Sequence, residues 1–367
     1  MTGEIGELIA TSNLYDGRKH DTVAKISAIN WAGRNLSYNL ADWIGISFSV
    51  DQAWADSVGV TPIELTLHAF RQTCIKLGTA VWPRRNKPLP VDYLLTLPDD
   101  VVEKNLNYAT ATYADKFPNR SWMFREYTTE NQEGVVTEKI RAVLDGQYPA
   151  VSNTELLQVT EKMTAGNPYT LVRPHLSPDE LNVRIAVKDV SDNYAVGVYV
   201  GNSEIGTSKI RILPFVQRHT CTNSIVSVDG GIELVHRGNI HALRVQLTAA
   251  LAQALHASGE ILERMIAAEQ ELIPNFADVL RGMSSQYNWS EAVTASAFFG
   301  TEGRETRAGL VNGVTFTAHK HFTGTAQAEM EMLGGAILAA PNSLFATAAR
   351  QAGRVSARVV EEYATEQ

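Results

Sequence analysis

The residues best suited to do chemistry are basic side chains at alternating positions in a β-rich stretch near the middle of the chain. Residues 205–225 contain Lys209, Arg211, Arg218 and His219 but no acidic side chain. Because side chains alternate between the two faces of a strand, Lys209 and Arg211 share a face if this stretch is extended. Cations aligned on a sheet face are suited to contact the phosphates of a nucleic acid.

A second pair of basic residues strengthens this prediction. In the stretch LNVRIAVK, residues 181–188, Arg184 and Lys188 lie on the polar face of an alternating strand. If the polar faces of these strands coincide, the sheet presents a basic strip to phosphate. The predicted nucleic-acid contacts are therefore Arg184, Lys188, Lys209, Arg211 and Arg218. An ordinary solvated sheet face is the alternative, and few aromatic side chains are available for stacking here: Tyr194, Tyr199 and Phe215.

The overall charge limits what such a strip can be. The chain has 367 residues, with 32 Lys and Arg against 40 Asp and Glu, which gives a formal net charge of −8. This balance excludes a uniformly basic binder but leaves room for a confined strip. The charges are also segregated, because residues 257–305 carry eight acids against three arginines whereas residues 205–225 carry no acid.

Histidine, cysteine and glutamate near the same segment raise a second possibility, a metal site. His219 and Cys221 lie two apart and His236 and His241 follow, but the spacing matches no standard zinc pattern. Glu204 lies between two glycines, where a carboxylate binds a divalent metal or a substrate or, as we favour, stabilises the turn by accepting backbone hydrogen bonds. We therefore predict no metal, no cofactor and no catalytic residue. A metal-dependent nuclease or hydrolase built on Glu204, His219 and Cys221 is the alternative.

The elements that would position these residues are strands followed by helices. Alternating patterns predict strands over residues 181–188, 194–200 and 209–212, and Asp229-Gly230 between two β-branched runs predicts a hairpin. Helical periodicity covers residues 240–272, with Gly259 as a possible break, and continues to the C-terminus. We expect an α+β protein with a central antiparallel meander that buries one face, flanked by helices, and a mainly helical C-terminal third.

Helices are also predicted before the sheet. A helix over residues 61–78 begins with Thr61 as its N-cap and ends at Gly78. A strand is predicted over residues 122–127. The spacing of apolar residues over 136–146 predicts a second helix, and a capping box at Ser152 and Glu155 opens a third that ends at Gly166.

The compartment follows from cysteine use and apolar content. The two cysteines are far apart in the sequence, which favours a reducing environment over a disulfide framework. The N-terminal residues show no basic start followed by an apolar run, and no window approaches the length of a membrane span. We expect a soluble cytoplasmic protein that does not engage a membrane.

Residues 193–225 also carry a family resemblance. They read NYAVGVYVGNSEIGTSKIRILPFVQRHTCTNSI, which looks like the core motif of the phage/plasmid-like protein family, domain of unknown function nine-three-two. The family usually has a glycine after the Thr-Asn pair, where this chain has Ser224. Arg218 and Thr222 also match the motif, and the residues that the resemblance marks as a structural motif are Asn202, Ser203, Glu204, Gly206, Cys221 and Asn223.

The resemblance covers residues 121–340 and implies a three-part chain. Residues 1–120 would be an N-terminal extension, 121–340 the family core, and 341–367 a C-terminal helix and tail. The family's biochemistry is largely unassigned. The order of its elements is similar to that of single-strand annealing proteins, such as the RecT and Redβ groups. The resemblance thus implies a homo-oligomeric protein that binds and anneals single-stranded DNA in recombination or replication, located in the host cytoplasm if phage-encoded.

A third interpretation rests on alanine-rich helices. The segments Ala249–Ala257 and Ala346–Ala357 have small side chains that allow close helix approach. Such faces are suited to contacts between copies of an oligomeric scaffold or assembly protein. They are equally suited to pack inside one chain.

Overall fold

The computed structural model shows an α+β protein with antiparallel sheets and a helical C-terminal region, as predicted. It describes residues 4–32, 35–37, 63–78, 94, 96–130, 134, 136–166, 168–219, 223–236 and 240–350. Some sequence predictions fall outside these residues. They concern Thr61, Cys221, Thr222 and the end of the alanine-rich segment 346–357.

The chain folds into two compact units. Unit 1 comprises Met1–Ala10, Asn153–Ser203 and Ser208–Gln367, and unit 2 comprises Thr11–Ser152 and Glu204–Thr207. The division therefore falls after residue 152 and not at residue 120, because residues 121–130 pair with the N-terminal strand 19–25 and residues 136–145 pair in turn with 121–130. The four-residue turn Glu204–Thr207 belongs to unit 2, although the strands before and after it belong to unit 1.

The sheet of unit 1 is the predicted antiparallel meander. Five strands follow one another in the order β11-β10-β9-β8-β7, and β12 also pairs with β10. From β7 to β11 each strand lies beside its neighbour in sequence, as short connections favour. The strands are β7 (Thr170–Leu176), β8 (Glu180–Ser191), β9 (Tyr194–Ser203), β10 (Ile210–Arg218), β11 (Ser224–Val226) and β12 (Ile232–Leu234).

The hairpin predicted at Asp229-Gly230 is wrong. The two β-branched runs become β11 and β12, which do not pair with each other but both pair with β10. Strand β11 lies opposite Phe215–Gln217 and β12 lies opposite Ile210–Ile212. Because β10 is long enough to pair with both, the turn at Gly230, where φ is 75°, connects two segments along one sheet edge.

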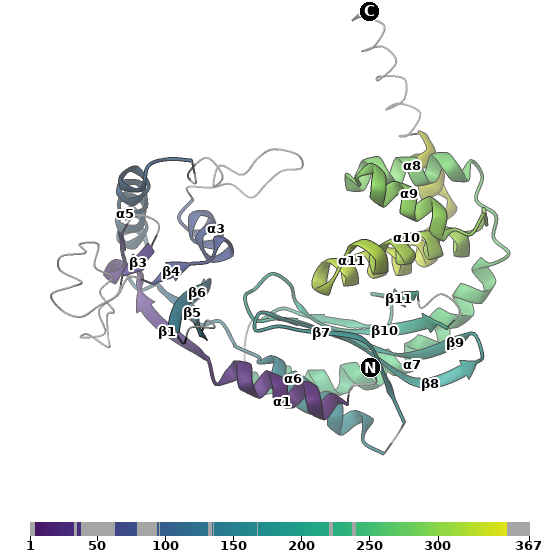
Figure 1. The fold of residues 1–367 in the computed structure, drawn as a ribbon, viewed down its shortest axis with the longest axis horizontal. Helices are drawn as coiled ribbons and strands as arrows, with labels where there is room; N and C mark the ends of the chain where they lie inside the picture. The colour runs from purple at the N-terminus through teal and green to yellow at the C-terminus, as the bar shows by residue number, and fades with distance from the viewer. Residues whose placement is uncertain are drawn as a thin grey trace, which may run out of the picture. The chain divides into compact units, whose positions relative to one another are not determined.

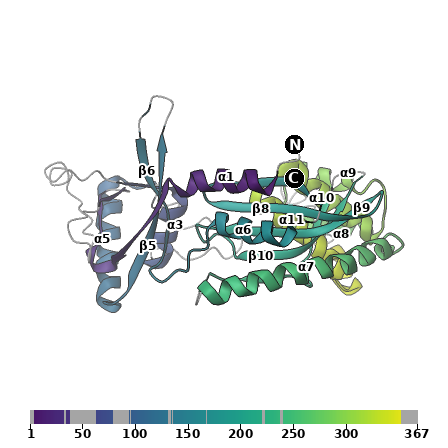
Figure 2. The same ribbon diagram turned by 90° about the horizontal axis from the view of Figure 1, so that it is seen from below.

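Helices cover both faces of this sheet, whereas the sequence predicted one buried face. Figure 1 shows the sheet between α6 and α7 on one side and α10 and α11 on the other. Seen from below, α7 runs along β10 and α6 lies beside β8 (Figure 2). The helices of unit 1 are α6 (Asn153–Thr164), α7 (Ile240–Ala268), α8 (Phe276–Tyr287), α9 (Glu291–Gly300), α10 (Arg307–His321) and α11 (Gly324–Ala339).

Side-chain alternation explains why one face of the sheet differs from the other. On β8 and β9, the buried Val183, Ile185 and Val198 share one face, and α7 packs against β9 and β10. Arg184 and Tyr199 point to the opposite face, which α11 covers. The meander is therefore apolar toward α7 and partly polar toward α11.

Unit 2 is built on a second sheet, with strand order β1-β5-β6-β4, in which only β4 runs parallel to its neighbour. Helices α3 and α5 contribute apolar side chains to a core with Trp31, Trp122 and Phe124. The elements are α1 (Ile5–Asp16, which begins in unit 1), β1 (Lys19–Lys25), η1 (Ile26–Ala28), β2 (Asn30–Ala32), β3 (Asn35–Ser37), β4 (Glu64–Leu65), α3 (Leu67–Lys76), α5 (Asp99–Lys116), β5 (Ser121–Glu130) and β6 (Val136–Asp145).

The helix predicted over residues 136–146 is wrong, because Val136–Asp145 forms strand β6. A register shift between β5 and β6 pairs Arg125 with Ala142 and Glu126 with Ile140, so Arg141 is an extra residue. This bulge places Ile140 and Val143, three residues apart, in the same apolar core. A spacing of three is typical of helices, which is why the sequence pattern was misleading.

The other predicted helix boundaries are partly confirmed. Residues 64–65 form β4, and α3 begins only at Leu67, where the Thr66 hydroxyl accepts a hydrogen bond from the Ala69 amide. The predicted end at Gly78 is confirmed, since α3 stops just before this glycine at φ 71°. Helix α7 continues through Gly259 without a break, so its 29 residues extend about 43 Å.

No single helix among the described residues has both the length and the apolar composition to cross a membrane. Helix α11 and the helical segment Asn342–Arg350 pass that test only as a pair, with a bend of 116° between them.

Two glycines in helices should respond oppositely to alanine. Gly259 lies exposed inside α7 with no neighbour near an added Cβ, so Gly259→Ala should raise the free energy of unfolding by about 1 kcal/mol. At Gly282 in α8 an added Cβ would lie 1.9 Å from the Ala348 carbonyl oxygen, so Gly282→Ala should lower the free energy of unfolding by about 1–3 kcal/mol. Urea unfolding measures both. Equal effects of the two variants would contradict the packing of α8 against residues 342–350.

Candidate nucleic-acid interface

Arg184, a predicted phosphate contact, lies inside unit 1 with 1% of its surface exposed. Its Nε donates a hydrogen bond of 2.6 Å to Glu331 Oε2 on α11, and its guanidinium lies over the Tyr199 ring at 5.5 Å. Among the described residues, its Nη2 has no hydrogen-bond partner. Arg184 therefore forms an ion pair in the protein interior. For this reason Arg184 is not part of the proposed interface.

Glu331 is the centre of a buried polar network. Its Oε1 accepts hydrogen bonds from Gln327 Nε2 at 2.8 Å and from His319 Nε2 at 3.0 Å. Burial alone would raise the pKa of Glu331, but Arg184 and His319 hold it below the usual value. Burial lowers the pKa of His319 despite the attraction of Glu331, and Arg184 lowers it further. A neutral ring that donates from Nε2 leaves Nδ1 as an acceptor, and this buried atom has no partner among the described residues.

Lys209 and Arg211 do share a face, as predicted, but an acid lies between them. Glu233 on β12 accepts from Lys209 Nζ and from Arg211 Nε, both at 2.9 Å. Burial of Glu233 would raise its pKa, and the two cations lower it below the usual value. Arg211 is mostly covered and also lies 3.9 Å from Glu329 on α11, whereas the Lys209 side chain is 48% exposed.

The remaining two predicted contacts differ from each other. Arg218 at the end of β10 lies 3.7 Å from Glu302, in the turn after α9. Lys188 is exposed beyond a register shift in β8 and forms no ion pair with any described residue. The structure thus brings Arg184 and Arg211 to one sheet face, as expected, but acids from β12 and α11 lie on the same face.

The motif residues are mostly interior. In unit 1, Asn202 donates to Asn153 Oδ1 at 2.9 Å, and Asn223 donates to the Asn312 carbonyl oxygen at 3.3 Å. Ser203 is fully buried, and Gly206 adopts a φ of 75° in the turn of unit 2. These placements give the motif a structural explanation in turns and element junctions.

Glu204 lies at the centre of an ionic cluster within unit 2. Lys19 Nζ donates to Glu204 Oε1 at 2.9 Å, and Arg141 Nη2 donates to Oε2 at 3.1 Å. Arg125 Nη1 donates to the Glu204 carbonyl oxygen at 2.6 Å while its Nε binds Asp21 at 2.8 Å. The pKa of Arg125 is raised by Asp21 and Glu204 in spite of its burial, and burial together with Glu204 raises the pKa of Tyr148.

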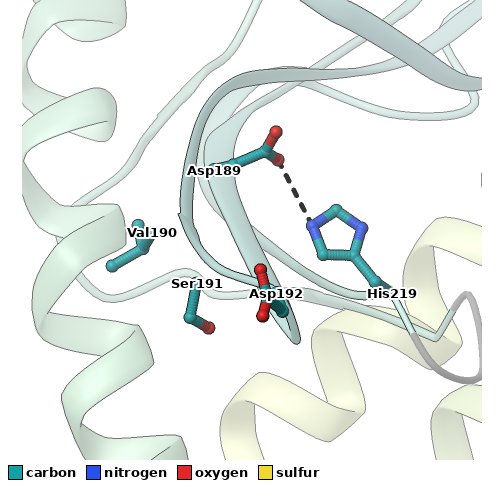
Figure 3. Close-up of a pocket in the computed structure, with 5 residues that line it drawn as sticks. All are labelled: Asp189, Val190, Ser191, Asp192 and His219. Carbon is teal, nitrogen blue, oxygen red and sulfur yellow. Dashed lines mark ion pairs between the residues drawn. The ribbon is translucent and has the colours of Figure 1, made fainter.

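The metal-site alternative built on Glu204, His219 and Cys221 stays a prediction. Glu204 belongs to unit 2 and His219 to unit 1, while Cys221 lies outside the described residues. His219 pairs instead with Asp189 at 3.3 Å across an open depression of about 360 Å³, where Asp192 also points (Figure 3). His236 is buried and the His241 side chain is outside the described part.

Unit 2 holds a cluster that the sequence analysis missed, here called the basic–aromatic patch: Lys76, Lys116, Arg120, Tyr113, Phe117 and Trp122. Lys116 Nζ lies 5.5 Å and Arg120 Cζ 5.3 Å from the Phe117 ring centroid. The Phe117 and Tyr113 rings are 4.8 Å apart, and Arg120 donates to the Tyr113 hydroxyl at 2.9 Å.

The second half of the patch continues from these rings. Trp122 lies 5.9 Å from Tyr113, and Lys76 Nζ lies 5.9 Å from the Trp122 ring. Burial lowers the pKa of Lys76, and Arg120 adds to this while Asp145 opposes it. Tyr113 and Phe117 are partly exposed, whereas Trp122 is buried and packs against Tyr113.

Lys116 and Arg120 have no acidic partner among the described residues, whereas Lys76 feels the charge of Asp145 without forming an ion pair with it. Neither Lys76, Lys116 nor Arg120 forms an ion pair within this part of the chain. The signal was present in the sequence as KFPNRSW, residues 116–122, where basic and aromatic residues alternate after a helix.

Comparisons of this chain with protein-family models, with curated proteins and with solved structures find no match. The resemblance of residues 121–340 to the phage/plasmid-like family, and the similarity to single-strand annealing proteins, therefore stay predictions.

The buried network makes unit 1 sensitive to acid. His319 has a lowered pKa in the folded state, so the unfolded chain binds a proton first as the pH falls through about 6.5, and stability is lost from there downward. The lowered pKa of Glu331 adds a further loss below about 4.5. We expect the unfolding temperature of the wild type to fall on acidification from neutral pH. The unfolding temperature of His319→Gln should fall less over the same pH range.

His219→Gln is the matched control, because His219 is exposed and lies on the surface. It should keep the full acid sensitivity of the wild type in thermal unfolding followed by circular dichroism. If His319→Gln and the wild type show the same dependence on pH, His319 is not held neutral in the folded protein.

Proposed function

We propose that this protein binds single-stranded DNA through the basic–aromatic patch of unit 2, without sequence preference. The observation that carries the proposal is that Lys116 and Arg120 lie over the Phe117 ring and form no ion pair with any described acid, while Lys76 lies over the Trp122 ring beside them. Single-stranded nucleic acids are bound by this pairing of cations, which attract the backbone, with rings on which bases stack.

Replacing a cation–ring contact within the protein by a stacked base of DNA is energetically favourable. A cation over a ring at an exposed site contributes about 0.5–1 kcal/mol. A base stacked on the same ring contributes about 1–3 kcal/mol. Lys116 is exposed at the end of α5, so it can move aside and bind phosphate while a base takes its place on Phe117.

The charge pattern supports a local interface on an acidic protein. The net charge of −8 repels DNA at long range, so binding depends on the few cations of the patch. Each phosphate neutralised on a single strand changes the slope of log K against log salt by about −0.7. Up to three contacts therefore give a moderate salt dependence.

Strand annealing in recombination or replication, and assembly into homo-oligomers, are the wider part of the same proposal. They are supported by the expected order of elements, in which α6, the meander and the long helix α7 follow one another. Mass photometry with and without single-stranded DNA tests the assembly. Annealing of two complementary labelled strands, followed by energy transfer, tests the activity.

Removing the ring should weaken binding more than removing an unrelated charge. We expect Phe117→Leu, which keeps apolar volume but removes the stacking surface, to raise the dissociation constant by about 5-fold or more. Lys116→Gln should reduce the salt slope by about 0.7. Fluorescence anisotropy with labelled oligothymidylate at several salt concentrations measures both.

Lys104→Gln is the matched control. Lys104 is an exposed lysine on the same helix, but it pairs with Asp100 at 3.3 Å and contacts no ring. Its loss should leave affinity and salt slope nearly unchanged, and duplex DNA should compete weakly because its bases are already stacked. No binding by the wild type at low salt, or equal affinity in Phe117→Leu, would overturn the proposal.

A further inference from the structure

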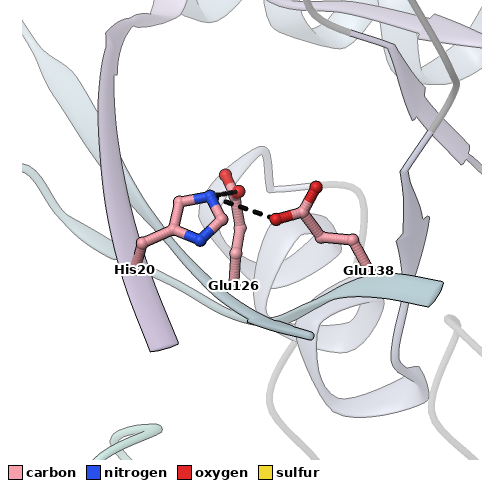
Figure 4. Close-up of side chains that lie close together, drawn as sticks. All are labelled: His20, Glu126 and Glu138. Carbon is pink, nitrogen blue, oxygen red and sulfur yellow. Dashed lines mark ion pairs between the residues drawn. The ribbon is translucent and has the colours of Figure 1, made fainter. Parts of the chain in front are cut away.

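Three metal-ligating side chains converge on neighbouring strands of unit 2. His20 on β1 lies directly opposite Glu126 on β5. Glu126 in turn lies opposite Ile140 on β6, and Glu138 is two residues before Ile140, so its side chain points to the same face. Figure 4 shows both carboxylates beside the same nitrogen of the His20 imidazole.

The ligand atoms of the three side chains lie close enough to share one ion. One nitrogen or oxygen from each of His20, Glu126 and Glu138 lies within 4.8 Å of the others. His20 Nε2 is 3.1 Å from Glu138 Oε1 and also contacts Glu126 Oε2. Two ligands held at about 2.1 Å from one metal ion are about 3.0–3.4 Å apart, for angles between octahedral and tetrahedral. The His20–Glu138 spacing falls in this range.

Burial changes steadily across the three side chains. The Glu126 side chain is fully enclosed, Glu138 is 34% exposed and His20 is 51% exposed. An ion bound there would be fixed from the inside by Glu126 and would remain open to water on the outer side. Three protein ligands with an open position is the arrangement of metal sites that also hold water or a substrate.

The ligand set narrows the identity of the ion. One imidazole nitrogen with two carboxylate oxygens suits zinc, manganese or another divalent first-row metal. Magnesium and calcium prefer oxygen ligands alone. Two carboxylates and a neutral imidazole together match the charge of one divalent cation.

We propose that His20, Glu126 and Glu138 form a binding site for a divalent first-row metal ion, zinc or manganese, on the sheet of unit 2. The site is separate from the basic–aromatic patch, since Glu126 lies four residues from Trp122 on β5, about 14 Å along the strand.

Metal titration of the full chain tests this site directly. After chelator treatment, the wild type should bind one Co²⁺, seen by isothermal titration and by the visible absorption of Co²⁺ with nitrogen and oxygen ligands. Zn²⁺ should displace it and raise the unfolding midpoint. His20→Asn and Glu138→Gln alter partly exposed side chains, so the fold should survive. Each should weaken binding at least about 10-fold.

His175→Asn is the matched control, because His175 is a similarly exposed strand histidine that pairs with a single carboxylate, Glu180, at 2.8 Å. It should bind Co²⁺ as the wild type does. Two results would overturn the proposal: a wild type that takes up no Co²⁺, Zn²⁺ or Mn²⁺, which leaves a simple histidine–carboxylate ion pair, or unchanged uptake in His20→Asn. Circular dichroism of each variant confirms that a loss of binding is not a loss of fold.

Discussion

The interaction on which the arrangement of unit 1 depends is the buried ion pair between Arg184 and Glu331. An unpaired charge in a protein interior is too costly to keep, so Arg184 on β8 requires an acid from whatever element covers its face. That element is α11, whose Glu331 approaches to 2.6 Å. The pair fixes which side of the meander α11 occupies and leaves the apolar side for α7.

In unit 2 a buried charge is likewise compensated by opposite charges from neighbouring strands. Glu204 is enclosed, and Lys19, Arg125 and Arg141 bring cations to it from three strands. Arg141 is the extra residue in the bulge of β6, so the irregularity in the strand supplies one of the cations. Removing one partner from such a cluster costs about 3–5 kcal/mol, because the remaining charges stay buried.

Local pattern allowed much of the fold to be predicted, and non-local contacts account for most of the errors. Alternation predicted β8, β9 and β10 and their order, because strands joined by short turns pair with their neighbours. The bulge at Arg141 could not be predicted, because it depends on the pairing with β5. It gave a strand the spacing of a helix.

The candidate site shows the same division between local and non-local information. Residues 205–225 contain no acid, yet Glu233, Glu329 and Glu302 reach their cations from elements far along the chain. A count of charges by sequence segment therefore overestimates how basic a sheet face is. The alternation of Lys116, Phe117 and Arg120 was readable, because those residues contact one another within a short stretch.

The availability of each cation to DNA follows from what its release would leave behind. Moving Arg184 to a phosphate would leave Glu331 buried and uncompensated, at a cost of about 3–5 kcal/mol, more than one exposed phosphate contact returns. Moving Lys209 to a phosphate would break only a surface ion pair with Glu233, which contributes about 0–1 kcal/mol, so Lys209 can exchange this acid for a phosphate. Lys116 would leave only a ring, which a base then covers, and Arg120 would also give up an exposed hydrogen bond to the Tyr113 hydroxyl. By this ranking the patch in unit 2, and not the sheet face of unit 1, is where binding DNA costs the protein least.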